Sequence, residues 1–273
     1  IAQINRKVSR NMADISCTVI GAGGVGGRLL DILTQVLNYG SVTYQFDEAF
    51  LKIVDGDTYE ARNKDRQKFH KDGNKAEVTA ERLKPDYENV NIVPHGKFLT
   101  EDNIKEIITE DDVVFCCVDN HATRLLVSKH CQSLNNVTLI SGGNELFDGN
   151  VQVYVRRGSI DLTPSIETFH GEIAEPKDKN PAYVEKKPGC DALVETHPQL
   201  LIVNNRVSAI MLEVFQEQLL DSIGKVHEVF FDSRTHKQRP KVYDAWVKAK
   251  EEAKAEAEKA DAPAEKSESE VSV

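Results

Sequence analysis

The chain has 273 residues, of which 40% are hydrophobic and 29% are charged, and its formal net charge is −10. This composition indicates a globular protein with ample core, and the acidic balance argues against a general binder of nucleic acids or anionic membranes. No apolar run reaches the roughly 18 to 20 residues of a membrane span, and the first residues lack a signal-peptide layout. We therefore expect a cytoplasmic protein with no nucleic-acid or membrane partner.

The cysteines are odd in number and lack C-x-x-C spacing, which gives no disulfide framework and excludes a sequence-local zinc ribbon. We expect no zinc site and a reducing compartment. The five residues are Cys17, Cys116, Cys117, Cys131 and Cys190.

A glycine-rich turn follows the first predicted strand. Residues 1–14 form a basic, irregular arm, and the β-branched run Cys17 to Ile20 then leads into G-A-G-G-V-G-G at 21–27. Apolar residues with helical spacing follow from Arg28 to Leu37. Glycines allow close backbone approach to a phosphate, and a helix N-terminus supplies free N–H groups, so the pattern favours nucleotide binding over a structural turn. The predicted binding residues are Gly21, Gly23, Gly24 and Gly26.

Two acids follow the second predicted strand, Leu51 to Val54. Dinucleotide sites usually have an acid about 20 residues after the glycines, whereas Asp55 comes 55 − 26 = 29 residues after Gly26. We expect residues 40–50 to be an insertion, either a hairpin or an extra strand. Carboxylates of Asp55 and Asp57 at the carboxyl end of a strand could hold a ribose or a metal.

Three polar residues and a lysine come next. Asn63, Arg66 and Gln67 could reach phosphate oxygens, although a charged, solvated loop is the alternative. Lys75 lies in the first turn of the predicted helix 74–83, where a cation opposes the helix dipole. Its position indicates an anionic ligand, or else an exposed lysine.

The middle of the chain alternates strands and helices, which predicts a doubly wound α/β sheet. The strands are expected at 90–93, 113–118 and 137–140, the helices at 101–108 and 121–134, and a turn at 141–144. The apolar run 113–118 indicates a central parallel strand. It ends in Asp119 and Asn120; Asp119 is a natural magnesium ligand, and helix capping by either residue is the alternative.

The last part of the chain predicts fewer regular elements. We expect an edge-type antiparallel strand at 151–157, an irregular segment at 158–197, an amphipathic helix at 198–220, a strand at 227–231 and a basic connection at 234–243. Residues 244–273 predict a charged helix that frays into a disordered acidic tail. The predicted fold is thus a Rossmann-like, doubly wound, mostly parallel sheet with antiparallel strands at one edge.

Five ordered motifs resemble the ThiF/MoeB family, the adenylating domain of ubiquitin-activating enzymes. They are G-A-G-G-V-G at 21–26, D-G-D at 55–57, N-K-D-R-Q at 63–67, K-A-E-V-T-A-E-R-L at 75–83 and D-N-H-A-T-R at 119–124. The resemblance covers residues 15–156 and the late helix and strand. It implies an adenylation domain at 15–243 that uses ATP and Mg²⁺ to adenylate the C-terminal carboxylate of a ubiquitin-like or sulfur-carrier protein or peptide. A homodimer is also implied.

The resemblance also implies roles for individual residues. Asp55 would hold the ATP ribose, and Lys75 would contact phosphate. Asp119 would coordinate Mg²⁺. The other residues implied at the nucleotide are Asp57, Asn63, Arg66, Gln67 and Asn120. Arg66, Lys75 and Asp119 with its metal would supply the charge that adenylation requires, because a terminal carboxylate is already ionised and is its own nucleophile.

The sequence departs from the family in several places. Many members carry C-x-x-C zinc ligands after the strand near residue 155, and this chain has none. Arg6 or Arg10 is a candidate for the arm arginine that reaches the partner subunit's ATP. Cys190 lies where some members keep an acyl- or sulfur-accepting cysteine, and an idle loop thiol is the alternative.

Two other functions remain open. A non-catalytic scaffold subunit would share the fold. An NAD-dependent oxidoreductase would share the glycine turn but gives no reason for the polar set Asn63, Arg66, Gln67 and Lys75.

Overall fold

The computed structural model describes residues 14–43, 46–60, 63–64, 67–184, 201–221 and 226–242. Most of the N-terminal arm, Arg66, Cys190 and the acidic tail lie outside the described residues, and so do the expectations that concern them.

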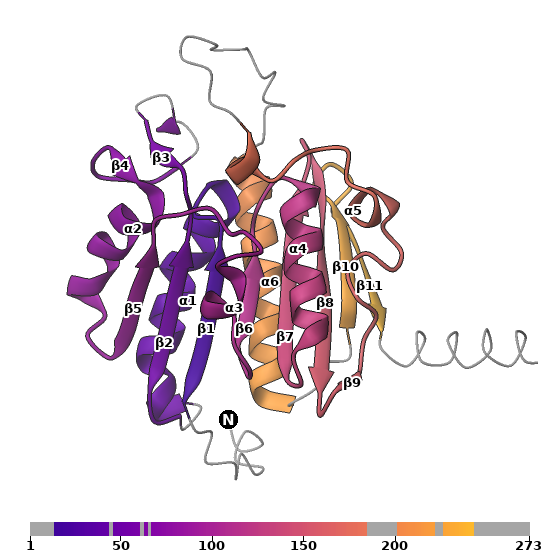
Figure 1. Cartoon of the computed structure of the whole chain (residues 1–273), viewed down its shortest axis with the longest axis horizontal. Coiled ribbons are helices and arrows are strands. Elements are labelled where there is room, and N and C mark those ends of the chain that lie inside the picture. Colours follow the sequence, from indigo (N-terminus) through magenta and orange to yellow (C-terminus); the bar gives the residue numbers. More distant parts are fainter. Residues whose placement is uncertain are drawn as a thin grey trace, which may run out of the picture.

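A nine-stranded sheet forms the centre of the molecule, with the order β11-β10-β8-β7-β6-β1-β2-β5 and with β9 paired to β8 (Figure 1). Its parallel part consists of β1 (Ile15–Ile20), β2 (Ala49–Val54), β5 (Val90–His95), β6 (Val113–Cys116) and β7 (Val137–Asn144). Its antiparallel part consists of β8 (Asp148–Arg157), β9 (Ile160–Asp161), β10 (Val226–Asp232) and β11 (Lys237–Val242). A separate ribbon pairs β3 (Thr58–Tyr59) with β4 (Gly73–Asn74). The predicted Rossmann-like sheet with one antiparallel edge is confirmed.

Helices cover both faces of this sheet (Figure 1). One face carries α1 (Gly24–Thr43), α2 (Lys75–Leu83) and α6 (Leu201–Asp221); the other carries α3 (Ile104–Ile107), α4 (His121–Ser133) and α5 (Gly171–Ala174). The short helices η2 (Lys84–Asp86) and η3 (Pro181–Tyr183) follow α2 and α5. Each face has its own buried apolar cluster, in which Leu33 and Met211 belong to the first and Val127 and Ile173 to the second.

The central strands are apolar because both of their faces are covered. On β1, Cys17 and Val19 are fully buried, and on β6, Val114 and Phe115 are too. Parallel strands in such positions lose contact with water on both sides, which favours an unbroken apolar run over an alternating one.

The described residues of the expected insertion at 40–50 form neither a hairpin nor an extra strand. Helix α1 continues to Thr43, and β2 begins at Ala49. The ring of Phe46 packs closely on Gly40 of this helix, where a Cβ would lie 1.9 Å from the ring. Most of the residues between Gly26 and Asp55 therefore belong to α1 and β2.

The antiparallel edge is also larger than predicted. The expected turn at 141–144 is wrong, because β7 runs to Asn144 and pairs with β8 from Gly149. In that strand, Gly142 allows α6 to pack directly on the backbone, because a Cβ at this position would lie 2.4 Å from the Met211 sulfur. Strand β8 is not an edge strand, because it pairs with β7 on one side and with β10 on the other. The expected basic connection at 234–243 contains strand β11.

The segment predicted to be irregular contains regular elements in the part that the structure describes. Residues 158–184 contain β9, α5 and η3, and Ile166 and Ile173 are each 3% exposed. These apolar side chains pack under α4 and belong to its cluster. No helix in the described ranges is both long and apolar enough to cross a membrane.

Candidate functional site

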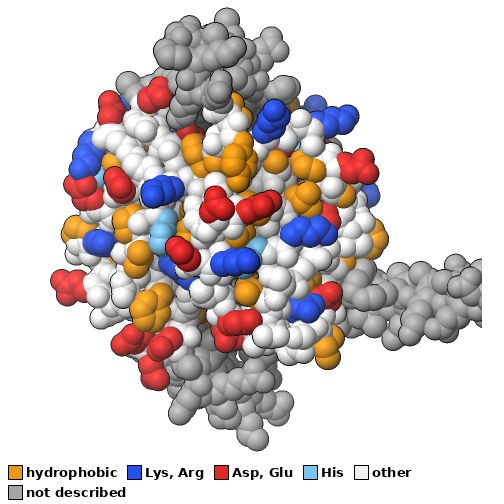
Figure 2. Space-filling view, viewed as in Figure 1, with side chains coloured by type: hydrophobic (Ala, Val, Ile, Leu, Met, Phe, Trp, Pro, Cys, Tyr) orange, Lys and Arg blue, Asp and Glu red, His pale blue; other side chains and the backbone are white. Residues whose placement is uncertain are grey.

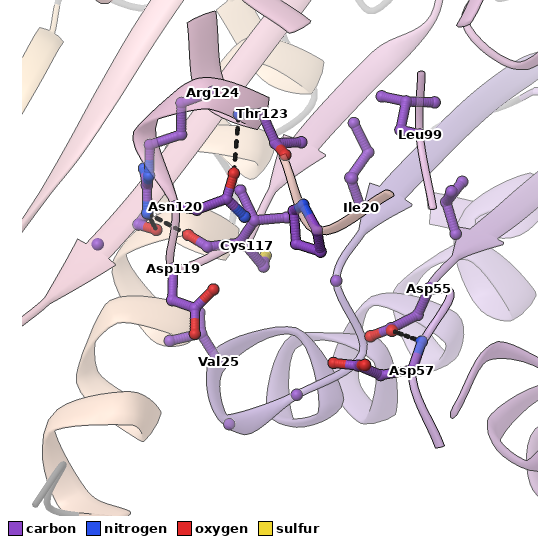
Figure 3. A pocket seen from close by; sticks show the side chains of 18 of the residues that line it. Ile20, Val25, Asp55, Asp57, Leu99, Cys117, Asp119, Asn120, Thr123 and Arg124 are labelled. Carbon is purple, nitrogen blue, oxygen red and sulfur yellow. Dashed lines mark hydrogen bonds between the residues drawn. The ribbon is translucent and has the colours of Figure 1, made fainter. Parts of the chain in front are cut away.

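A cavity of about 1030 Å³ opens at the carboxyl ends of the parallel strands. Its wall is formed by the glycine turn after β1, the loops after β2, β5 and β6, the ends of β7 and β8, and residues of α5 and η3. Figure 3 shows side chains from several of these loops around one open space. Ligands of open α/β sheets bind at this edge, in the crevice between two neighbouring strands whose connections lead to helices on opposite faces of the sheet.

The glycine turn is tight and closely packed. Gly21 has a φ of +92°, a left-handed conformation, and its N–H donates to the Val54 carbonyl at 2.8 Å. A Cβ on Gly26 would lie 1.8 Å from the Gly21 carbonyl oxygen. Gly21, Gly23 and Gly24 line the cavity, whereas Gly26 allows the turn to close behind them.

Asp55 holds this turn in place. One carboxylate oxygen accepts the Ala22 N–H at 2.7 Å and the other accepts the Asp57 N–H at 2.9 Å. Burial, the largest influence, raises the pKa of Asp55, and nearby Lys75 and the two N–H bonds oppose that rise. Each oxygen keeps a second lone pair, so Asp55 could still accept a bond from a ligand hydroxyl.

Lys75 is the first residue of α2 and lines the cavity. Its side chain is 12% exposed, and its Nζ lies 3.4 Å from Asp57 Oδ2. Asn74 caps the same helix, accepting the Ala76 N–H at 3.0 Å and donating to the Asp55 carbonyl at 2.9 Å. The cation opposing the helix dipole thus has an acid beside it and a cavity in front of it.

Asn63 and Gln67 form the outer wall. The Asn63 side chain accepts the Glu60 N–H at 3.1 Å, and its carbonyl accepts the Gln67 N–H at 2.9 Å. The Gln67 carboxamide lies 3.8 Å from the position of a Cβ on Gly23, next to the glycine turn.

Asp119 and Asn120 follow β6 and have different environments. The Asn120 side chain accepts the Thr123 N–H at 2.8 Å and caps α4, which is the alternative raised from the sequence. Asp119 lines the cavity, and Figure 3 shows it and Asp57 on opposite sides of the open space.

The acids suit a metal that is shared with a ligand. Within the described ranges, no group of three or more His, Cys, Asp or Glu residues could hold an ion. Magnesium usually takes one or two carboxylates and completes its shell with phosphates and water, so Asp119 fits a magnesium–nucleotide complex.

Three helix N-termini, those of α1, α2 and α4, face the cavity, and two are already occupied. Asn74 caps α2. At α4, the Asp178 carboxylate accepts the His121 and Ala122 N–H groups, each at 2.8 Å. The residue before α1 is Gly23, which has no side chain that could cap the helix. An anion entering the cavity therefore finds the free N–H groups and positive dipole end of α1 behind the glycine turn.

Several lining residues were not predicted from the sequence. Asn180, which is 7% exposed, donates to the Leu99 carbonyl at 2.7 Å and carries its segment across the cavity. Its only sequence signal is the Asn-Pro turn at 180–181. Arg124 is buried and donates to Ser141 Oγ and the Val118 and Gly142 carbonyls at 2.6 to 2.7 Å, joining the loops after β6 and β7.

The pKa of each described cysteine is shifted away from that of a reactive thiolate. Burial raises the pKa of the Cys17, Cys116, Cys117 and Cys131 thiols. These thiols therefore stay protonated at neutral pH and lack the thiolate that reaction would need.

The fold and the cavity define a Rossmann-like α/β protein with a glycine turn at the rim of its sheet. The model of the ThiF family matches residues 1–215. The chain belongs to the ThiF family.

Curated relatives match about half of the chain. The adenylyltransferase and sulfurtransferase MOCS3 of Caenorhabditis briggsae is 32% identical over 149 residues, covering 53% of this chain and 34% of the relative. MOCS3-2 of Zea mays is 31% identical over 154 residues, covering 55% of this chain and 30% of the relative. The matched part thus spans about a third of each relative's length.

Solved structures share the fold at lower identity. Escherichia coli MccB crystallised with AMPCPP and MccA superposes with a TM-score of 0.61 at 16% identity, covering 84% of this chain and 64% of that chain. MccB with ATP gives a TM-score of 0.60 at 16% identity, with coverage of 84% and 63%.

Proposed function

We propose that this protein is an ATP- and Mg²⁺-dependent adenylyltransferase that activates the C-terminal carboxylate of a ubiquitin-like or sulfur-carrier protein or peptide. The observation that carries the proposal is the meeting of the uncapped α1 N-terminus, Lys75 and Asp119 around one cavity. Curated relatives named adenylyltransferases, and the MccB structures with AMPCPP or ATP, support the same assignment.

The reaction needs charge neutralisation more than an added nucleophile. A terminal carboxylate, with a pKa of about 3.5, attacks as its own anion. Its oxygen bonds to the α-phosphorus, the bond from that phosphorus to the bridging oxygen breaks, and pyrophosphate leaves with the electron pair. The α1 N-terminus and Lys75 would hold the phosphates, and Asp119 would hold magnesium, which neutralises phosphate charge when bound.

The remaining assignments extend this proposal. Asp55 would meet the ribose with its free lone pairs while Asn63, Gln67, Asp57 and Asn120 line the nucleotide. Arg66 would add a further cation, Arg6 or Arg10 would reach across a homodimer, and Cys190 would accept the acyl group or sulfur. These last four residues lie outside the described ranges and rest on the family resemblance.

The test compares nucleotide binding with catalysis. We expect ATP with Mg²⁺, and not NAD, to raise the melting temperature, since a ligand that binds only the folded state stabilises it. With small ubiquitin-like acceptors, we expect ATP–pyrophosphate exchange that Asp119→Ala lowers by at least about 100-fold, the usual scale for a lost transition-state charge partner. Asp102→Ala, an exposed acid in the turn before α3, is the matched control.

Exchange that survives Asp119→Ala at the wild-type rate would contradict the magnesium role. ATP binding without exchange for any acceptor would instead favour the scaffold. Stabilisation by NAD alone would favour the oxidoreductase.

A further inference from the structure

His170 lies between two carboxylates, immediately before α5. Its Nε2 is 2.6 Å from Glu228 Oε1 on β10, and its Nδ1 is 2.9 Å from Glu172 Oε1 on α5. A neutral imidazole carries one N–H, whereas an imidazolium carries two. Ionised carboxylates accept hydrogen bonds and cannot donate them, so both contacts are hydrogen bonds only while His170 is protonated.

The charged and titratable groups around His170 come from four of the described elements. Glu172 belongs to α5 and Glu228 to β10, and on β11 the Lys241 Nζ lies 2.7 Å from Glu228 Oε2. His121, at the start of α4, lies near enough to Glu172 to favour its ionised form. With His170 protonated, its charge and that of Lys241 balance the two carboxylates.

The two carboxylates differ in what the loss of the proton would cost them. Glu228 is 3% exposed, whereas Glu172 is 54% exposed. A buried carboxylate that loses a donor costs more free energy than an exposed one, because water replaces the donor only at the exposed site. The remaining N–H therefore stays on Nε2, toward Glu228. Nδ1 then faces Glu172 with a lone pair, and the two repel each other.

Glu172 lines the same cavity as Lys75 and the glycine turn. While His170 is protonated, the imidazolium offsets the charge of this carboxylate. When the Nδ1 proton passes to water, the network keeps two carboxylates and one cation, so the cavity wall gains one uncompensated negative charge. A polyanion such as ATP is repelled by that charge.

The pKa of His170 places this change on the alkaline side of pH 6.5. The hydrogen bond to Glu228 is the largest influence and raises the pKa above its ordinary value of 6.5; burial opposes the rise, and the bond to Glu172 adds to it. Because the folded state favours the protonated form, the stabilisation from these bonds is complete below pH 6.5 and is lost as the pH rises through the raised pKa.

We propose that His170 is a pH-sensitive latch that holds Glu172 while protonated and, on losing its proton, releases this carboxylate at the cavity wall and weakens the binding of ATP. The inference rests on the proposed function for the identity of the ligand. The release of Glu172 itself depends only on the bonds around His170.

The test measures ATP affinity by calorimetry with Mg²⁺ at low ionic strength, between about pH 6 and pH 9, a range that includes the alkaline side of an ordinary histidine pKa. We expect wild-type affinity to fall about three- to ten-fold as the pH rises, the order expected for one unit charge that acts on a polyanion across a solvated cavity. The profile of each variant is compared with that of wild type, which cancels the ionisation of ATP itself.

Two variants should remove the step and remain at opposite levels. Glu172→Gln has no charge to release, so it should keep the tighter, low-pH affinity throughout. In His170→Gln the new side chain carries no charge and donates through one nitrogen, so the weaker, high-pH affinity should apply throughout. If His170→Gln fails to fold, Glu172→Gln still decides the outcome.

Two other histidines provide controls. His70 is exposed, its Nε2 lies 3.8 Å from Glu81 Oε1, and it does not line the cavity, so His70→Gln should keep the wild-type profile. His121→Asn removes the other histidine near Glu172 and should also keep the step. A step that disappears in His121→Asn would overturn the inference, because His121 would then be the group that titrates.

An NMR titration of the His170 imidazole tests the latch without nucleotide. We expect a pKa above 6.5 in wild type that falls in Glu172→Gln. A His170 pKa at or below 6.5, or a wild-type affinity profile equal to that of Glu172→Gln, would overturn the inference. A raised His170 pKa that falls in Glu172→Gln, in a protein that binds no ATP at any pH, would contradict the proposed function and leave the pairing of His170 with Glu172 standing.

Discussion

The backbone of Ala22 makes two hydrogen bonds that fix the shape of the glycine turn. Its N–H donates to Asp55 at 2.7 Å, and its carbonyl accepts the Tyr59 hydroxyl at 2.8 Å. Tyr59 is 1% exposed and also contacts Thr79 Oγ1 at 3.0 Å. The turn is thereby fixed in the shape that directs the α1 N-terminus toward the cavity before any ligand binds, which lowers the ordering cost of binding.

Two neighbouring glycines should respond in opposite ways to the same substitution. In Gly26→Ala the new Cβ would lie 1.8 Å from the Gly21 carbonyl oxygen, so the turn must open. We expect the free energy of unfolding to fall by about 1 to 3 kcal/mol, the usual cost of overpacking. In Gly27→Ala the nearest atom, the Ala22 carbonyl oxygen, is 3.4 Å away, and alanine favours a helix.

Urea denaturation should therefore show Gly27→Ala to be as stable as wild type, or more stable by about 0.5 to 1 kcal/mol. Similar destabilisation of both variants would mean that loss of glycine, and not the contact at Gly21, sets the effect.

At this scale the sequence predicts which residues meet but not how they bond. Gly21, Asp55 and Asp119 could be placed at neighbouring strand ends because strands of a parallel sheet share a carboxyl edge. The bonds from Asp55 to Ala22 and Asp57 depend on loop conformation, which hydrophobic periodicity does not encode. The role of Asn180 depends on a contact between residues that are 81 positions apart in the chain.

Among the elements, the segment from α5 to η3 links the two sides of the cavity. We call residues 171–184 the covering segment. Its Asp178 binds the N-terminus of α4, its Asn180 binds the Leu99 carbonyl after β5, and its Ile173 packs into the α4 cluster. Figure 1 shows the segment running past α4 toward the top of α6. The composition of residues 158–197, rich in proline and charge, gave no sign of these contacts.

We predict that Asp178 both caps α4 and holds the covering segment in place. Asp178→Ala removes both N–H contacts, so we expect the free energy of unfolding to fall by about 0.5 to 2 kcal/mol, as for other lost caps. Hydrogen exchange should become faster at His121, at Ala122 and within residues 171–184. Lys177→Ala, an exposed neighbour in the same segment, is the control and should leave these rates unchanged. Unchanged exchange in Asp178→Ala would show that Asn180 and Ile173 hold the segment without it.

Over the whole molecule, the alternation of strands and helices was predictable and the strand order was not. The apolar run that becomes β6 and the glycine turn after β1 fix a doubly wound core, because each pattern permits few alternatives. The antiparallel edge depends on pairing between β8 and β10, for example Asn150 with Phe230. The antiparallel strand at 151–157 and the strand at 227–231 were predicted from the sequence, but their pairing was not, because the pattern of one strand does not specify which distant strand pairs with it.

The net charge of −10 is not gathered into one acidic patch on the face of the molecule shown in Figure 2. Figure 2 shows acidic, basic and hydrophobic side chains intermixed on one face, without a dominant patch of one sign. On this face, the intermixing leaves no broad surface of one sign that would attract an oppositely charged macromolecule.

We predict that a substitution at the end of the parallel strands away from the cavity lowers stability without changing ATP affinity. Away from the cavity, Lys52 of β2 lies 2.7 Å from Asp112, which is fully buried just before β6 and also accepts the Thr109 N–H at 2.9 Å. Lys52→Met leaves that carboxylate buried without its cation, which typically costs 3 to 5 kcal/mol. We therefore expect a large fall in melting temperature, with ATP affinity unchanged wherever the variant is still folded.

Lys68→Met is the control. It breaks an exposed pair with Asp31, in which Lys68 is 59% exposed, and should cost less than about 1 kcal/mol. Because Lys52 and Asp112 do not line the cavity, a loss of ATP affinity in folded Lys52→Met would show that the two ends of the sheet are coupled.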